Sequence, residues 1–239
     1  MVALIFSLIA AASAVGGGML PLYTRVRNIH SRYLLGFAAG VMLSVAFLEM
    51  LPEMVAEGET SFIFLAVGFF SLYVVEKLVL VHSCPEGECD STTTIGWTAL
   101  IGIAAESLLD GVAIGIGFHL APAVGLTIAL AVLIHEFPRG FATAVIMRTA
   151  GYNMRRIWGA LSIDALFTPL GVVLVLLGVF PEGFFVPLMA FAAGTFIYVG
   201  ASDLLPEAHR TFNKWVIASV LLGVALIPVL RPVTHLAGL

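Results

Sequence analysis

Two short motifs place ionisable side chains inside long apolar stretches of this chain. The first has the sequence ESLLDG and begins at Glu106, and the second has the sequence HEFPRG and begins at His135. Their ionisable members are Glu106, Asp110, His135, Glu136 and Arg139. A charged side chain at the centre of a bilayer costs at least about 2.5 kcal/mol. These groups therefore need one another, a cation or a water-filled path, and we expect a metal-cation site within a transport pathway.

The spacing within each motif indicates how a site forms on two helices. Glu106 and Asp110 are four residues apart and share one helix face, and His135 and Arg139 share a face of the next helix in the same way. Glu136 lies about 100° around the helix from His135. If the two faces meet, three carboxylates and an imidazole converge. This donor set suits first-row divalent ions such as Zn²⁺, Fe²⁺ or Mn²⁺.

Other interpretations of the same residues remain open at this point. Glu136 and Arg139, three residues apart, could form a simple buried ion pair, and Asp110 with Arg139 could form one between helices. Either pair still leaves Glu106 and His135 for a metal. His135 could also be a hydrogen-bonded core histidine. A proline inside the second motif, Pro138, is expected to kink its helix because it removes a backbone hydrogen bond.

The composition is that of an all-α integral membrane protein. Of 239 residues, 60% are hydrophobic and 11% charged, whereas soluble domains have about 25% charged residues. We expect one transmembrane transporter domain over residues 1–239. It should be embedded in the lipid bilayer and should bind no nucleic acid. A spanning helix needs about 20 apolar residues. Eight such stretches are expected to be helices: 2–22, 34–53, 61–80, 95–119, 123–147, 157–179, 184–205 and 215–230.

The basic residues indicate the orientation. No Lys or Arg precedes Arg25, so the first stretch is interpreted as a membrane helix and not as a cleaved signal peptide. Alternate loops and helix ends carry nearly all the positive charge, at Arg25, Arg27, Arg32, Lys77, Arg148, Arg155, Arg156, Arg210 and Lys214. Only Arg231 falls on the other side. Because basic loops face the cytoplasm, both termini are expected to be extracytoplasmic, in the cell (inner) membrane.

An internal repeat relates the two halves of the chain. The tetrapeptide FAAG begins at Phe37 and again at Phe191, and each copy is followed twelve residues later by an acid, Glu49 or Asp203, and then by Leu-Pro-Glu. The two helices run in opposite directions, so the repeat is inverted. With the two polar helices between the halves, this predicts a 3+2+3 arrangement, which is typical of transporters. Chance recurrence of small residues, which membrane helices use for packing, is the alternative.

At these positions the chain resembles the ZIP (ZRT/IRT-like) family of divalent-metal transporters. The likeness covers nearly the whole chain. The family's helix-4 motif, His-Asn-x-x-Glu/Asp-Gly, is matched in part by ESLLDG, and its helix-5 motif, His-Asn/Glu-x-Pro-Glu-Gly, by HEFPRG. The segments DLLPE, from Asp203, and GVM, ending at Met42, also match. The resemblance implies two adjacent metal positions, the first formed by Met42, Glu106, Asp110 and His135. The second would use Ser107, Asp110, Glu136 and the positions held here by Arg139 and Thr168.

Four positions depart from the family pattern. Glu106 and Ser107 stand where the family has His and Asn, Arg139 where it has a bridging carboxylate, and Thr168 where it has Glu before proline. An arginine is always charged and binds no metal. We therefore expect Arg139 to fill the second position as a built-in cation. One transported ion, Zn²⁺ foremost, would remain.

Further polar residues are expected along the path. Glu49 and Glu53 could attract cations at the outer end, and Asp203, Glu207 and His209 could receive them at the inner end. Asp164 could line the same cavity or cap the path. A cytoplasmic loop over residues 82–94, between the third and fourth helices, offers His82, Cys84 and Cys89 as loop metal candidates. Ordinary solvated acidic residues and free thiols are the alternative interpretation.

The sequence thus predicts a transporter that moves divalent transition-metal ions (zinc, or iron, manganese or cadmium) into the cytoplasm by alternating access. One alternative is a non-transporting metal-binding or sensing relative in which Arg139 blocks the path. An intramembrane metallohydrolase is disfavoured, because its His-Glu-x-x-His motif would need histidine at Arg139, so the chain is not expected to be an enzyme. Small-residue helix faces make a homodimer possible.

Overall fold

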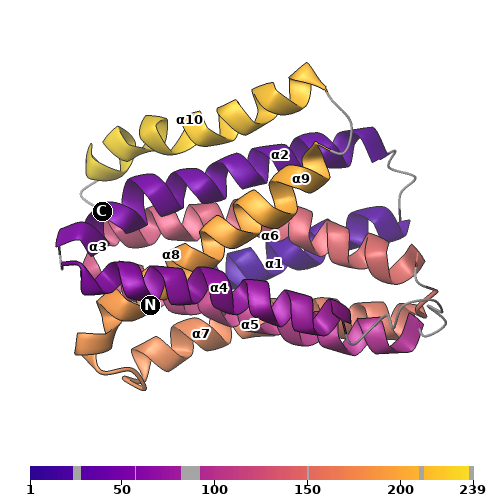
Figure 1. Ribbon diagram of the computed structural model, residues 1–239, viewed down its shortest axis with the longest axis horizontal. Coiled ribbons are helices and arrows are strands. Elements are labelled where there is room, and N and C mark those ends of the chain that lie inside the picture. The colour runs from indigo at the N-terminus through magenta and orange to yellow at the C-terminus, as the bar shows by residue number, and fades with distance from the viewer. Residues whose placement is uncertain (24–27, 57, 82–91, 150, 210–212, 237–239) are drawn as a thin grey trace.

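The computed structural model describes residues 1–23, 28–56, 58–81, 92–149, 151–209 and 213–236, and all regular structure in these ranges is helical. Figure 1 shows a bundle in which the chain runs back and forth along the long axis. The long helices are α1 (Val2–Tyr23), α2 (Asn28–Val45), α4 (Thr60–Val81), α5 (Thr92–Leu120), α6 (Pro122–Thr149), α7 (Met154–Leu176), α8 (Phe185–Tyr198) and α10 (Lys214–Leu236). Short helical segments join or extend them: η1 (Ala46–Met50), α3 (Leu51–Ala56), η2 (Glu182–Phe184), η3 (Val199–Leu204) and α9 (Leu205–Ala208).

The expected stretches are helical except at the end of the sixth. Helix α5 begins at Thr92, so the last three residues of the loop expected over 82–94 are helical. The sixth stretch was expected to reach residue 179, but α7 ends at Leu176. Gly178 adopts a positive φ of 68°, and the Val179 N–H donates to the Leu174 carbonyl at 3.1 Å. This is the geometry of a glycine-terminated helix, so the glycine ends the helix before the apolar sequence ends.

Five segments in the described part of the chain are long and apolar enough to cross a membrane. They are Val2–Tyr23, Arg32–Met50, Pro122–Val145, Met154–Leu176 and Glu182–Leu204. Two shorter apolar helices, Thr60–Val75 and Lys214–Val229, accompany them. Their outward sides carry large apolar residues such as Leu166, Leu222 and Val229, each at least 66% exposed, which suits contact with lipid. The expectation of an all-helical fold with membrane-spanning helices is therefore confirmed for the described residues.

Four helix pairs are held together by glycines that face each other's backbones. At each of these glycines, an added Cβ would lie 1.9–2.2 Å from a carbonyl oxygen of the partner helix, so only glycine allows the approach. The pairs are Gly17 and Gly140 (α1 with α6), Gly111 and Gly171 (α5 with α7), Gly40 and Gly223 (α2 with α10), and Gly68 and Gly194 (α4 with α8). Such close packing of small residues is the usual way in which membrane helices associate.

Two π-helical segments, η1 and η3, occupy matching places in the two halves. Each directly precedes a Leu-Pro-Glu segment, and the N–H groups of Leu51 and Leu205 bond to carbonyls five residues earlier, at Ala46 and Gly200. The proline that follows has no N–H to donate. A π turn is wider than an α turn, so it changes which backbone carbonyls are left without a hydrogen-bond partner. The repeated sequence is therefore accompanied by the same π-helical widening in both halves.

Candidate metal centre

The polar faces of α5 and α6 meet in the interior of the bundle. Glu106, Asp110 and His135 each offer one ligand atom, and these three atoms lie within 4.8 Å of one another. The side chains of Asp110 and His135 are each 1% exposed, whereas that of Glu106 is 15% exposed. The i, i+4 spacing therefore places the carboxyl groups of Glu106 and Asp110 on the face of α5 that meets the His135 imidazole.

His135 is oriented by contacts on both sides of its ring. Its Nδ1 lies 3.0 Å from the Ala131 carbonyl, and its Nε2 lies 3.2 Å from Oδ2 of Asp110. Phe196 of α8 packs against the ring edge to face, with 5.7 Å between the ring centroids. Because a carbonyl only accepts, Nδ1 carries a proton and a neutral ring has its lone pair on Nε2. That lone pair faces a carboxylate oxygen, so a cation between the two atoms, either a proton or a metal ion, would remove their repulsion.

Arg139 lies among the acids of both motifs and joins them. Its Nη1 is 2.8 Å from Oδ2 of Asp110 and 3.3 Å from Oε1 of Glu106. Its Nη2 contacts Glu136 and lies 2.9 Å from Oδ1 of Asp164. The two ion pairs that the sequence offered as alternatives, one with Glu136 and one with Asp110, are thus made by the same guanidinium.

A second group of polar residues surrounds Nη2 and includes two from α7. Ser107 accepts from Nη2 at 2.8 Å and donates to Oδ1 of Asp164, and Thr168 donates to Oε1 of Glu136 at 3.3 Å. Helix α7 can come this close because residue 111 is a glycine, whose missing Cβ leaves room for the Thr168 carbonyl. The sequence indicated that Asp164 could line the same cavity or cap the path, but it did not predict that Asp164 binds Arg139.

The centre holds more carboxyl groups than cationic groups. Four carboxylates face one guanidinium, and Oδ1 of Asp110, Oε2 of Glu136 and Oδ2 of Asp164 are buried with no hydrogen-bond partner among the described residues. Buried carboxylate oxygens without partners are costly. The arrangement is therefore suited to accept a further cation.

The remaining predicted residues lie outside the two polar motifs. Met42 is fully buried in the main hydrophobic core, and Glu49 is buried on η1 while Asp203 is exposed on η3. His209 caps α9 through its Nδ1, 3.0 Å from the Leu205 carbonyl. Glu53 and Glu207 lie in α3 and α9, where only their backbone is described. The loop candidates His82, Cys84 and Cys89 lie outside the described residues.

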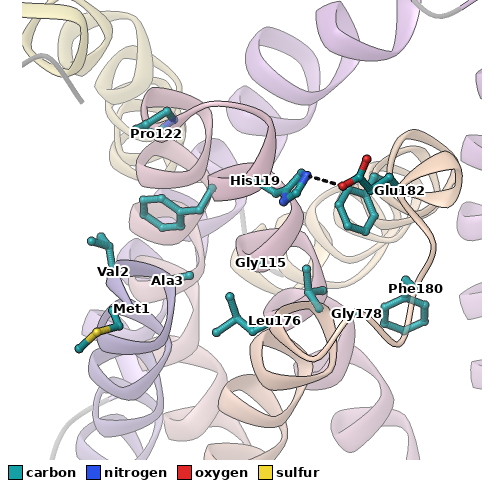
Figure 2. A pocket seen from close by; sticks show the side chains of 13 residues that line it. Met1, Val2, Ala3, Gly115, His119, Pro122, Leu176, Gly178, Phe180 and Glu182 are labelled. Atoms are coloured by element: carbon teal, nitrogen blue, oxygen red, sulfur yellow. Dashed lines mark ion pairs between the residues drawn. The ribbon is translucent and has the colours of Figure 1, made fainter.

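A cavity of about 590 Å³ lies where α5 ends and α6 begins (Figure 2). His119 and Glu182 stand at its side, with 3.7 Å between Nε2 and Oε1. Its lining includes Gly115, five residues beyond Asp110 on α5, and none of the acids bound to Arg139. The cavity and the polar centre are therefore distinct features.

Comparison with known proteins identifies the family. The profile of the ZIP zinc transporter family matches residues 82–231, which include both polar motifs, α7 and α8. The chain belongs to the ZIP family. The resemblance found in the sequence is thereby confirmed, and the apolar helices are those of an integral membrane protein.

Several family members align with much of the chain. A zinc transporter ZIP9 from Micropogonias undulatus is 27% identical over 196 residues, which cover 72% of this chain and 63% of that protein. A ZIP13 from Pongo abelii is 25% identical over 78% of this chain and 61% of its own length. The metal cation symporter ZIP8 from Rattus norvegicus is 32% identical over 51% of this chain and 26% of its own length. This chain spans less than two thirds of the length of these relatives.

Proposed function

We propose that this protein carries a divalent transition-metal ion, Zn²⁺ foremost, across a membrane into the cytoplasm. The observation that carries the proposal is the buried cluster of Glu106, Asp110 and His135, with three ligand atoms within 4.8 Å of one another. Carboxylate oxygens and an imidazole nitrogen are ligands for Zn²⁺. Membership in a family whose relatives are named zinc transporters, with one named a metal cation symporter, supports the same cargo.

The exposure of the cluster is consistent with a carrier that opens to one side at a time. Glu106, one turn before Asp110, is the more exposed of the two, and the residues just beyond Asp110, from Gly111 to Gly117, are buried. In the topology inferred from the basic loops, the start of α5 faces the cytoplasm. We infer that this conformation is closed on the outer side and gives limited access past Glu106 from the cytoplasm.

Alternating access is supported by the internal repeat. We propose eight membrane-spanning helices in a 3+2+3 order within one domain, with both termini extracytoplasmic in a cell membrane. The glycine contacts pair α1 with α6 and α7 with α5, and likewise α2 with α10 and α8 with α4. An inverted repeat would generate these matching pairs, and rocking one repeat-related group against the other would open the site on alternate sides. A homodimer and metal binding by the loop over residues 82–94 remain predictions.

A second candidate function follows from Arg139. Its Nη1 donates to Oδ2 of Asp110 at 2.8 Å, the carboxylate oxygen that faces His135 Nε2, so a divalent ion bound there would meet a positive charge. If the guanidinium could not leave, the protein would bind metal weakly or only sense it. We favour one working metal position with Arg139 as a built-in cation beside it, because Glu106 and His135 can still serve as ligands.

Reconstitution separates these functions. Purified protein in liposomes containing a zinc indicator is exposed to Zn²⁺, Cd²⁺, Mn²⁺ or Fe²⁺, and influx is compared for the wild type, His135→Ala and the control His119→Ala. His119 is a partly exposed histidine outside the centre. We expect influx that His135→Ala abolishes and His119→Ala preserves. Zinc binding without influx would favour the sensing relative, and influx unaffected by His135→Ala would contradict the proposed site.

A further inference from the structure

The guanidinium of Arg139 is shared between two groups of acids with different partners. Nη1 faces Asp110 and Glu106, at 2.8 and 3.3 Å, and these carboxylates converge on His135 Nε2. Nη2 contacts Glu136, Asp164 and Ser107. The first group holds the three ligand atoms that lie within 4.8 Å. The second group, which we call the socket, is Glu136, Asp164, Ser107 and Thr168.

A metal ion held between Asp110 and His135 would lie close to Nη1. Oδ2 of Asp110 accepts from Nη1 and is also the oxygen 3.2 Å from His135 Nε2. An ion bound to both Asp110 and His135 would lie about 2.0–2.2 Å from each ligand atom, beside the place that Nη1 occupies. A guanidinium has donors only and cannot become a ligand. The like charges of the ion and the guanidinium then favour withdrawal of Nη1 from Asp110 when such an ion arrives.

The socket has the capacity to receive the guanidinium. Its four side chains are fully buried, and Oε2 of Glu136 and Oδ2 of Asp164 have no hydrogen-bond partner among the described residues. On the arginine, Nε likewise lacks a partner there. These groups give the socket unused hydrogen-bonding capacity for the guanidinium once Nη1 leaves Asp110. The charge released from Asp110 is then neutralised within the socket.

We propose that Arg139 is a tethered counter-cation that holds Asp110 and Glu106 in the empty site and yields them to the metal ion, and that Asp164 is the positioning residue that keeps the guanidinium in the socket. Metal affinity is then set by an exchange of cations, because binding replaces one positive charge at Asp110 by another. The same exchange leaves the carboxylates neutralised after the metal departs. This inference rests on the proposed function, because it assumes that the ion binds at Glu106, Asp110 and His135.

A double-mutant cycle on zinc affinity tests the inference. The dissociation constant for Zn²⁺ is measured by calorimetry on purified full-length protein for the wild type, Asp164→Asn, Arg139→Gln and the double variant. Arg139→Gln removes the competing cation and should tighten binding about tenfold. Asp164→Asn should weaken binding, because the guanidinium then relies more on Asp110. That loss should be at least about fivefold larger in the wild-type background than in the Arg139→Gln background, within the usual range for coupled neighbours.

The cycle distinguishes positioning from other roles of Asp164. Losing one negative charge near the site weakens zinc binding in both backgrounds, so only the difference between backgrounds reports on Arg139. An equal loss in both backgrounds, or weaker binding in Arg139→Gln than in the wild type, would overturn the inference. Glu182→Gln is the control, since it removes the same charge from an exposed side chain and should leave the constant unchanged.

Folding and the proposed function are controlled separately. If Asp164→Asn does not fold, Ser107→Ala replaces it, because the Ser107 hydroxyl contacts both Asp164 and Nη2. If Arg139→Gln does not fold, Arg139→Lys replaces it, since one ammonium cannot reach both groups of acids. Zinc binding that is lost in His135→Ala but shows no coupling between Asp164 and Arg139 contradicts this inference alone. Zinc binding insensitive to His135→Ala contradicts the proposed function as well.

Discussion

The approach of α7 to α5 at Gly111 positions the centre, so Gly111→Ala should disturb both stability and metal binding. The added Cβ would lie 2.0 Å from the Thr168 carbonyl oxygen and 2.9 Å from the Thr168 carbonyl carbon. Contacts of a real Cβ below 3.0 Å essentially never occur, and these neighbours are backbone atoms. Helix α7 must therefore move away by at least about 1 Å, in the range where overpacking costs about 1–3 kcal/mol.

The same displacement weakens the contacts between α7 and Arg139. The distance from Nη2 to Asp164 Oδ1 is 2.9 Å, and a shift of about 1 Å takes it out of the hydrogen-bonding range. A lost hydrogen bond to a charged group costs about 1.5–3 kcal/mol. Together the two effects predict a loss of about 2.5–6 kcal/mol, or a fall in melting temperature of about 5–24 °C for a chain of this size.

Gly159→Ala provides the matched control on α7. An added Cβ there meets nothing within 4 Å, so alanine should stabilise the helix by up to about 1 kcal/mol. Thermal unfolding in detergent is measured for both variants, together with zinc affinity. The reasoning is refuted if Gly111→Ala melts at the same temperature as Gly159→Ala and binds zinc as the wild type does.

Two further predictions concern charge at the centre. Arg139→Gln should destabilise the zinc-free protein by about 3–5 kcal/mol, because Glu136 and Asp164 lose their buried partner. Zinc at a hundred times its dissociation constant should restore about 2.7 kcal/mol of this stability. Thermal unfolding with and without zinc measures both effects. A variant that is as stable as the wild type without zinc would contradict the role of the ion pairs. Zinc affinity should fall as the pH is lowered, because protons compete with zinc for His135 and the carboxylates. Calorimetry at about pH 7.5 and 5.5 measures this change. An affinity that rises on acidification would be inconsistent with these ligands.

Much of the fold follows from patterns that lie within single helices. Apolar runs of about 20 residues located the helices, and i, i+4 spacing placed Glu106 with Asp110 and His135 with Arg139. The boundary at Leu176 was missed because hydropathy continues past it, whereas the helix end is set by the backbone of Gly178. The two π segments were not predicted, although the repeated Leu-Pro-Glu segments mark where they occur.

The socket could not be predicted from spacing. Asp164 and Ser107 lie on different helices, and their contact with Arg139 depends on how closely α7 packs on α5. That approach is allowed by Gly111 and Gly171, which resemble many other small residues in the sequence. The sequence placed a cation in the second position, while the division of its guanidinium between two groups of acids emerges only from the packing.

Anomalous scattering at the zinc edge tests the central claim most directly. Crystals of the full chain soaked with Zn²⁺ should show one peak among Glu106, Asp110 and His135, about 2.0–2.2 Å from His135 Nε2 and the carboxylate oxygens. Absence of a peak there, at a zinc concentration that saturates binding in solution, would contradict the account.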